Sequence, residues 1–305
     1  MKFRTYFKRN YDMYLMLLPA VIFVLIFNLV PMYGITLAFK DYDMFLSTSP
    51  MLSILKSPWV GMEHFQKLFR RPDFLAALRN TLEISLLKLL ITFPLPILFA
   101  ILLNEVRSVR FQKVLQTVVY LPHFLSWAVV AGIFVSLLGS TGLVNSLLVS
   151  LGGEKINFLM DNHWFRAVLI FSDAWKEVGW GSIIYFAAIA GLDQECFEAA
   201  EVDGANRLQQ IWYIMLPGIM PTIVLMLIMR VGGIMDAGFG QIFAMYNPTV
   251  YESADIIGTY VYRVGLGKMD FSMGTAVGLF NSVIGFILVV SSNTLAKKLN
   301  GKSIW

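Results

Sequence analysis

Four stretches of this sequence contain no charged residue over lengths that could cross a membrane. They lie at 13–39 (27 residues), 114–153 (40 residues), 208–229 (22 residues) and 271–296 (26 residues). A transmembrane helix needs about 20 predominantly apolar residues, so each stretch can hold one span. The chain is therefore predicted to be an integral membrane protein.

Two further segments are apolar but carry charges: residues 82–103 and residues 167–192. Together with the charge-free stretches they give six predicted spans, at 13–38, 80–103, 114–138, 166–191, 214–237 and 273–296. The predicted fold class is thus all-α, with six membrane helices. The first apolar run is longer than the 7–15 residues of a signal-peptide core and no small-residue cleavage site follows it, so we expect it to be retained.

The overall composition excludes several classes of protein. The chain is 57% hydrophobic and only 14% charged, whereas soluble domains carry about 25% charged residues. Cys196 is the one cysteine, which excludes a disulfide scaffold and a cysteine-based zinc site. The Lys and Arg residues are scattered rather than gathered in blocks, so no nucleic-acid partner is expected.

Motifs for catalysis on this chain are missing from the sequence. The three histidines have no partner at helical spacing, and there is no H-E-x-x-H, G-x-S-x-G or C-x-x-C pattern. Neither Gly-Lys pair has the earlier glycine that a phosphate-binding Walker A loop needs. We therefore expect no catalytic residues, no metal site and no cofactor on this chain.

The distribution of basic residues favours a cytoplasmic N-terminus. The total is nearly balanced between the two sides, so the short segments carry the assignment. The basic residues that support it are Lys2, Arg4, Lys8 and Arg9 before the first span, Arg107, Arg110 and Lys113 after the second, and Lys297, Lys298 and Lys302 after the sixth. An even number of spans then places both termini on the cytoplasmic side.

The loop between the fourth and fifth predicted spans is unusual because it is acidic and has the pattern of two short helices. Its carboxylates are Asp193, Glu195, Glu198, Glu201 and Asp203. Asp193 can cap a first helix, Gly204 ends it, and Asn206 can cap a second helix that runs to Leu216. An ordinary interfacial loop is the alternative, but this regularity favours a docking element for a partner protein.

The same loop resembles a known family. Glu198-Ala199-Ala200 is followed by three residues, Gly204, nine residues and then IMLP at 214–217. This matches the "EAA" loop of binding-protein-dependent ABC importer permeases at every position. Further stretches resemble the carbohydrate-uptake branch, and closely its LplB-type polysaccharide permeases: LVPMYGI at 29–35, WVGMEHF at 59–65, NEVR at 104–107, YLPHFLSW at 120–127 and WKEVGWGS at 175–182.

The resemblance implies a type I ABC importer transmembrane domain in a bacterial cell membrane, with a cytoplasmic coupling helix. It implies a second homologous permease, two ATP-binding subunits that hold ATP and magnesium, a solute-binding lipoprotein outside, and an oligosaccharide substrate. The domains expected are a basic tail, first helix and external loop at 1–76, the permease core at 77–292 and a cytoplasmic tail at 293–305. The residues implied to couple to the ATPase are Glu198, Ala199, Ala200, Gly204, Ile214, Leu216 and Pro217.

Charged residues inside predicted spans are costly and point to function. Counting depth along each span places Lys88, Asp173, Lys176, Glu177 and Arg230 in one band in the outer half of the bundle. Asp173 and Arg230 are predicted to neutralise each other, so removing both should be tolerated better than removing either. The band is either purely structural or lines a polar sugar pathway, for which the candidates are Asp173, Trp175, Lys176, Glu177, Trp180, Arg230 and Asn281.

A different class of function remains as the alternative, namely a secondary transporter or a membrane-embedded enzyme that acts without an ATPase. The enzyme would need a converging nucleophile or metal set, which the sequence lacks. A secondary transporter would usually show internal repeats, and none is convincing here.

Overall fold

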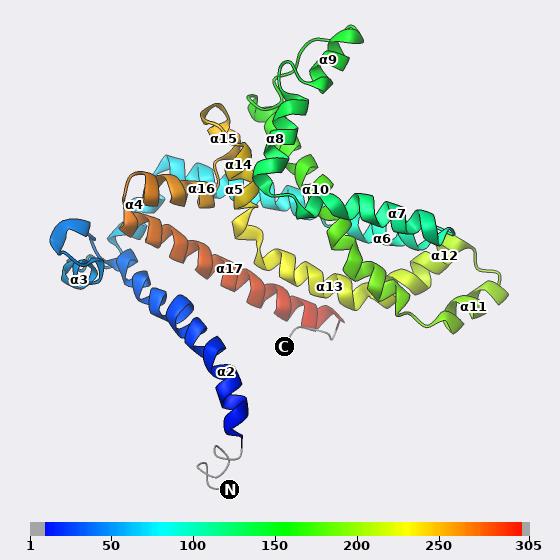
Figure 1. The fold of residues 1–305 in the computed structure, drawn as a ribbon, viewed down its shortest axis with the longest axis horizontal. Coiled ribbons are helices and arrows are strands. Elements are labelled where there is room, and N and C mark those ends of the chain that lie inside the picture. Colours follow the sequence, from blue (N-terminus) through cyan, green and yellow to red (C-terminus); the bar gives the residue numbers. More distant parts are fainter. Residues whose placement is uncertain (1–9, 301–305) are drawn as a thin grey trace. The chain divides into compact units, whose positions relative to one another are not determined.

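The computed structural model describes residues 10–300, and these residues fold almost entirely into helices (Figure 1). Within that range, β-structure is limited to one antiparallel bridge between Lys40 and Trp59, so the predicted all-α class is confirmed. The predicted basic N-terminal tail lies outside the described residues, as does Lys302. The chain divides into two units, one made of residues 1–71 and 261–280 and the other of residues 72–260 and 281–305.

The first unit begins with α2 (Tyr11–Val24), an apolar helix in which every residue is exposed. The helix passes into a π-helical turn at Leu25–Leu29 and a 3-10 segment at Val30–Phe39. Pro31 explains the change, because proline has no N–H and its ring clashes with the carbonyl four residues earlier. A helix that is apolar all round and uncovered needs lipid or another protein around it.

The rest of the first unit is a small folded region that polar contacts of Lys40 hold together. The Lys40 ammonium donates to the carbonyl oxygens of Ile54 and Leu55, at 2.7 and 3.1 Å. The Lys40 carbonyl accepts from the Ser272 hydroxyl at 2.7 Å. The helical segments of this region are η3 (Met44–Leu46), α3 (Pro50–Lys56), α4 (Glu63–Phe69), the π-helical η8 (Tyr262–Gly267) and the first part of α17 (Phe271–Asn300).

The second unit is a bundle built around the long helix α10 (Asn162–Ala190), which packs against α5, α6, α7, α13, α14 and α15. Asp161 starts α10, because its carboxylate accepts from the backbone N–H groups of His163 and Trp164. The other helices are α5 (Pro72–Thr92), α6 (Pro94–Asn104), α7 (Val109–Tyr120), α8 (Trp127–Leu138), α9 (Leu143–Ser150), α11 (Gln194–Val202), α12 (Arg207–Gln210), α13 (Leu216–Gly232), α14 (Phe239–Met245), α15 (Tyr251–Ala254), α16 (Ile257–Val261) and the later part of α17.

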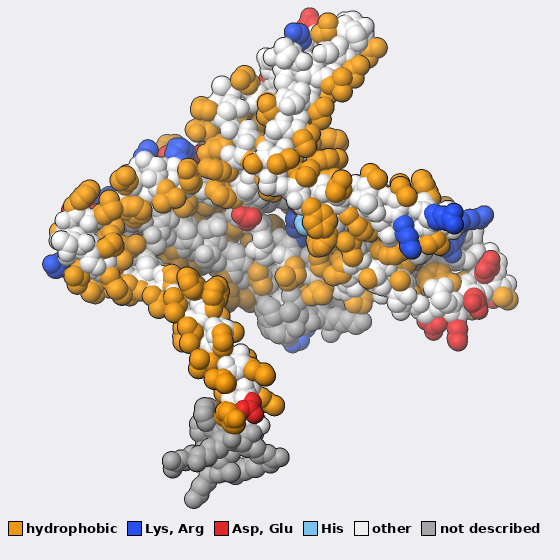
Figure 2. Space-filling view, viewed as in Figure 1, with side chains coloured by type: hydrophobic (Ala, Val, Ile, Leu, Met, Phe, Trp, Pro, Cys, Tyr) orange, Lys and Arg blue, Asp and Glu red, His pale blue; other side chains and the backbone are white. Residues whose placement is uncertain are grey.

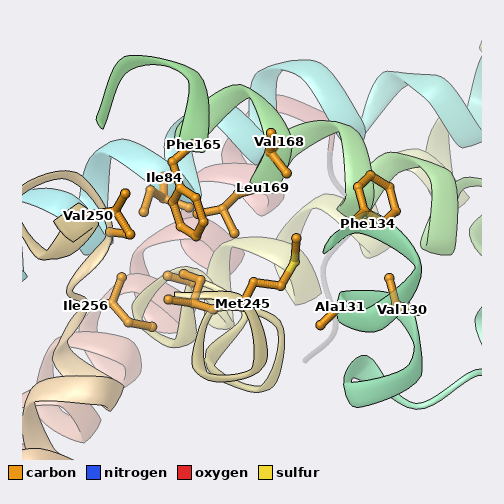
Figure 3. Close-up of a cluster of buried hydrophobic side chains, with 13 residues drawn as sticks. Ile84, Val130, Ala131, Phe134, Phe165, Val168, Leu169, Met245, Val250 and Ile256 are labelled. Carbon is orange, nitrogen blue, oxygen red and sulfur yellow. The ribbon is translucent and has the colours of Figure 1, made fainter. Parts of the chain in front are cut away.

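Two apolar clusters hold the second unit together on opposite halves of α10. In the first, Phe165, Val168 and Leu169 of α10 meet residues of α5, α8 and α14, including Ile84 and Met245 (Figure 3). These α10 residues are three and four apart, which places them on one face of the helix. The second cluster joins α6, α10 and α13 and contains Ala100, Ile101, Tyr185, Ile189, Met215 and Ile219. Between the two clusters lies the part of α10 that carries Asp173, Lys176 and Glu177.

Five segments are long and apolar enough to cross a membrane: Tyr11–Phe39, Pro72–Asn104, Trp127–Ser150, Arg207–Asp236 and Phe271–Lys298. They correspond to five of the predicted spans, and α10 lies at the remaining one as a continuous helix with four charged residues. The predicted third span, 114–138, is wrong as a single helix. The chain breaks at Leu121–Phe124, where Pro122 cannot continue the helix and Ser126 caps a new one.

Helices α7 and α10 approach each other so closely that one glycine is required between them. A Cβ atom on Gly179 would lie 2.1 Å from the Val119 carbonyl oxygen. Gly179→Ala is therefore expected to force the helices apart and to cost about 1–3 kcal/mol of stability. Gly132→Ala on α8 is the matched control, because a Cβ there meets nothing within 4 Å. Thermal unfolding of both purified variants checks this; equal melting temperatures would contradict it.

Candidate functional site: an acidic helical loop and a charged band

The acidic loop forms the two short helices that its sequence predicts. The Asp193 carboxylate accepts from the Glu195 N–H at 3.0 Å and starts α11. Asn206 and Gln209 exchange side-chain and backbone hydrogen bonds in a capping box at the start of α12. Gly204 joins the two helices with a φ of +81°, a conformation that glycine adopts without strain. These predicted caps and the predicted break are confirmed.

The sequence pattern predicts that the second short helix ends at Leu216, and this prediction is wrong. α12 stops at Gln210, and a π-helical turn at Ile211–Met215 leads without interruption into α13. Pro217 explains the wide turn, since it lacks the N–H that an α-helical hydrogen bond to the fourth residue before it would use. Ile214 lies in this turn, half-buried, and Leu216 packs against the cluster around Met215 and Ile219.

The loop is anchored at its base and exposed at its tip. Arg207 donates to Glu105 at 2.7 Å, which ties the loop to the end of α6. Phe197 packs against the second apolar cluster. Glu198, Ala199 and Gly204 are exposed, and Ala200 is half-buried. None of the loop's five carboxylates forms an ion pair with another described residue.

The surface around the loop separates into acidic and basic areas. Figure 2 shows acidic side chains gathered at the end of the second unit that carries α11, with basic side chains beside them. Large apolar side chains are also exposed on this loop: Val202, Leu208, Trp212 and Tyr213. Unpaired carboxylates next to exposed apolar side chains, on a base that is held in place, are suited to a protein partner with basic groups.

The charged band in the bundle is centred on Asp173 of α10. The Lys88 ammonium of α5 lies 3.0 Å from Asp173 Oδ1, and Arg230 Nη2 of α13 lies 3.3 Å from Oδ2. Arg230 Nη2 is also 3.3 Å from the Thr92 hydroxyl. The predicted Asp173–Arg230 contact is confirmed, and Lys88 is a second cation on the same carboxylate. The Lys88 and Asp173 side chains are 4% and 8% exposed, whereas that of Arg230 is 42% exposed.

Gln241 of α14 completes this part of the band, and the sequence pattern did not point to it. Its side chain is fully buried. It accepts a hydrogen bond from Lys88 and donates to the Leu169 carbonyl and the Ser172 hydroxyl, at 2.6 and 2.7 Å. The amide of Gln241 carries no net charge, so a search for charges in apolar segments cannot find it.

A second group of the band lies one turn further along α10. Glu177 is 2.8 Å from His123 Nδ1 and 3.4 Å from the Lys176 ammonium. The His123 ring stacks on the Trp180 ring, with centroids 4.4 Å apart and planes at 1°. The Lys176 ammonium also donates to the His123 carbonyl and lies 5.4 Å from the Trp127 ring centroid. His123 has no charged neighbours in the sequence, so only the fold reveals its partners.

Two cavities adjoin the band. The first, of about 230 Å³, is lined by residues that include Ser85, Lys88, Asp173, Arg230, Asp236 and Gly238. The second, of about 280 Å³, is lined by residues that include Thr92, Phe93, Glu177, Trp180, Tyr185 and Arg230. Arg230 lines both cavities.

Three of the predicted pathway residues line neither cavity. Lys176 is connected to the second cavity through its ion pair with Glu177. Trp175 packs edge-to-face on Phe134 of α8, with ring centroids 5.9 Å apart, and lines neither cavity. Asn281 lines neither cavity, and its side-chain oxygen is buried without a hydrogen-bond partner among the described residues. Their part in a pathway stays a prediction. Within residues 10–300, no group of three or more His, Cys, Asp or Glu side chains is placed to hold a metal ion.

Comparisons with known proteins agree on one family. Residues 93–301 match the family described as binding-protein-dependent transport system inner membrane component. The chain is 48% identical to the polygalacturonan/rhamnogalacturonan transport system permease protein YteP of Bacillus subtilis, over 96% of this chain and 90% of that protein. It is 45% identical to protein LplB of the same organism, over 98% and 92% of the two chains.

A solved structure agrees with these sequence relatives. It is the crystal structure of a bacterial alginate ABC transporter in complex with an alginate pentasaccharide-bound periplasmic protein. A chain of that structure superposes with a TM-score of 0.91 at 41% identity, over 100% of both chains.

Proposed function

Because the chain belongs to the family of binding-protein-dependent transport system inner membrane components, we propose that it is the permease subunit of an ATP-driven importer of oligosaccharides or polysaccharide fragments. It is a transporter subunit and not an enzyme. The relatives include a polygalacturonan/rhamnogalacturonan permease and an alginate transporter. A cargo derived from a polysaccharide is accordingly proposed for this chain.

The proposed assembly contains a second homologous permease, two ATP-binding subunits that hold ATP and magnesium, and a solute-binding lipoprotein outside the cell. In it, this chain crosses the membrane six times, with both termini in the cytoplasm. The exposed α2 supports a neighbouring permease, since an apolar helix whose residues are all exposed needs lipid or another protein around it. The permease core is proposed at 77–292, between an N-terminal region at 1–76 and a tail at 293–305.

The observation that carries this proposal is the anchored acidic loop, which we take to be the coupling element. In this mechanism α11 sits in a groove of the ATPase, where Glu198 pairs with a basic group and Ala199 and Ala200 let the two backbones approach. Movement of the ATPase is transmitted along the continuous helix from α12 through the turn at Ile211–Met215 into α13. Arg230, near the far end of α13, would move with it.

The charged band is proposed as part of the sugar pathway. Ionisable side chains at membrane depth face a bundle interior or a wet cavity, because lipid does not solvate them. Asp173, Lys176, Glu177 and Arg230 satisfy this by lining the two cavities or pairing with groups that do. Trp180 adds an aromatic ring to the lining of the second cavity. Trp175 and Asn281 are kept as further candidates for other stages of the transport cycle.

The test of this function is a comparison between the chain alone and the complete assembly. The chain alone is expected to show no ATP hydrolysis and no concentrative uptake in proteoliposomes, because it has no phosphate-binding loop. Adding the cognate permease and ATPase should produce ATP hydrolysis that increases with the sugar-loaded binding protein. Uphill uptake by the chain alone, driven by a proton or sodium gradient, would instead identify a secondary transporter.

A further inference from the structure

The second cavity contains one carboxylate, and this carboxylate is already neutralised. Glu177 is held between His123, at 2.8 Å, and Lys176, at 3.4 Å. The Lys176 side chain is only 6% exposed, so its charge acts mainly on Glu177 and on the His123 carbonyl. Glu177 therefore has no unpaired negative charge with which to attract a cationic ligand into the cavity.

Arg230 lines the cavity and shares its anion with a second cation. Its partner Asp173, at 3.3 Å, is also paired with the buried Lys88 at 3.0 Å, so the three side chains together carry one net positive charge. Asp236 also lies near the band, but it lines the first cavity and not the second. Arg230 uses only Nη2 in its contacts with Asp173 and Thr92. Its Nε and Nη1 donors are available to a ligand.

The Trp180 side chain gives the same cavity an aromatic surface. Trp180 is 45% exposed, and one face of its ring is fixed against His123. The C–H face of a pyranose ring is apolar and weakly positive, so it fits the electron-rich face of an aromatic ring. Thr92 and Tyr185 add hydroxyl groups to the lining. A largely apolar cavity with a few placed polar groups is the usual form of a small-molecule site.

We propose that this cavity is a subsite for an acidic sugar unit, in which Arg230 binds the carboxylate of a uronate and Trp180 stacks on its ring. This rests on the proposed function and adds a substrate class to it. A guanidinium suits a carboxylate better than an ammonium does, because its planar donors match the two oxygens. A neutral sugar would leave the net positive charge of Lys88, Asp173 and Arg230 without a counter-ion, so the subsite discriminates against it.

The experiment compares trigalacturonate with its fully methyl-esterified form, which has the same rings and no charge. The complete permease–ATPase complex is placed in nanodiscs of zwitterionic lipid without the binding protein, and affinities are measured by saturation-transfer NMR. Wild type is expected to bind the acid at least about tenfold more tightly than the ester, as a charge-assisted hydrogen bond would give. Arg230→Gln should bring that ratio close to one with ester binding unchanged, and Arg230→Lys should give an intermediate ratio.

Two further variants complete the design. Trp180→Ala should weaken both ligands by a similar factor, because stacking does not depend on the carboxylate. Arg79→Gln removes an exposed arginine that pairs with Glu83 outside both cavities, and should leave the ratio unchanged. A ratio near one in the wild type, or an equal loss of both ligands in Arg230→Gln, would overturn the subsite. ATP-driven uptake that persists in either case would leave the proposed transport function standing.

Discussion

Gly204→Pro is expected to abolish sugar uptake while the protein still inserts into the membrane. Gly204 has a φ of +81°, and proline fixes φ near −65°, so the turn between α11 and α12 cannot form. Proline also disfavours the helical conformation that Asp203 has before it, with φ −73° and ψ −2°. Gly204 is exposed and a Cβ there meets nothing within 4 Å, so the effect is on backbone conformation and not on packing.

Glu198→Lys is expected to have the same result by a different route. Glu198 is exposed and forms no ion pair in the described chain, so its replacement leaves the fold unchanged. It reverses one charge on a surface that we assign to a basic partner, and like charges at an interface cost several kcal/mol. Both variants should lose sugar-stimulated ATP hydrolysis in the reconstituted complex.

The matched controls lie just after α9, at an end of the second unit separate from the one that carries α11 (Figure 1). Gly152 follows α9 with a φ of +85° and open space around it, so Gly152→Pro imposes the same backbone change far from the loop. Glu154→Lys makes the same charge reversal at an exposed position. Both controls should retain uptake. Normal uptake by Gly204→Pro and Glu198→Lys at normal expression would rule out the coupling role of the loop.

Local signals explain which parts of this structure the sequence predicted well. The caps at Asp193 and Asn206 and the turn at Gly204 depend on neighbouring residues, so their pattern can be read directly. The break in the predicted third span was missed, because the uncharged stretch was taken as one continuous helix although it contains Pro122 and Ser126. Those two residues carried the local signal that would have found it.

Long-range contacts were predicted only where charge and depth could be counted. That reasoning brought Asp173 and Arg230 together, although they are 57 residues apart. It placed Lys88 at the same depth but could not show that Lys88 shares the carboxylate. The partners of His123 and Gln241 depend on how three or more helices pack, which spacing within one span does not encode.

Because Lys88 and Arg230 share the Asp173 carboxylate, the effect of removing each of the three side chains differs from the one expected for a simple pair. The sequence suggested that Asp173→Asn combined with Arg230→Gln would be tolerated better than either change alone. With Lys88 on the same carboxylate, Arg230→Gln still leaves a complete Lys88–Asp173 pair and should cost little. Asp173→Asn leaves two cations without an anion, one of them 4% exposed. Breaking a buried pair in this way costs about 3–5 kcal/mol.

The partner change that rescues Asp173→Asn is therefore expected at Lys88 and not at Arg230. Asp173→Asn with Lys88→Gln removes the buried charges together, and Arg230 keeps contact with water through its 42% exposed side chain. Asp173→Asn with Arg230→Gln still leaves the Lys88 ammonium unpaired and should stay destabilised. Melting temperatures of the purified single and double variants decide between these outcomes. The exposed Glu63–Lys67 pair is the control, where Lys67→Gln should shift the melting temperature little. The Lys88 double variant should lose less melting temperature than the sum of the losses of its two single variants. If its loss equals that sum, the three side chains do not act as one unit.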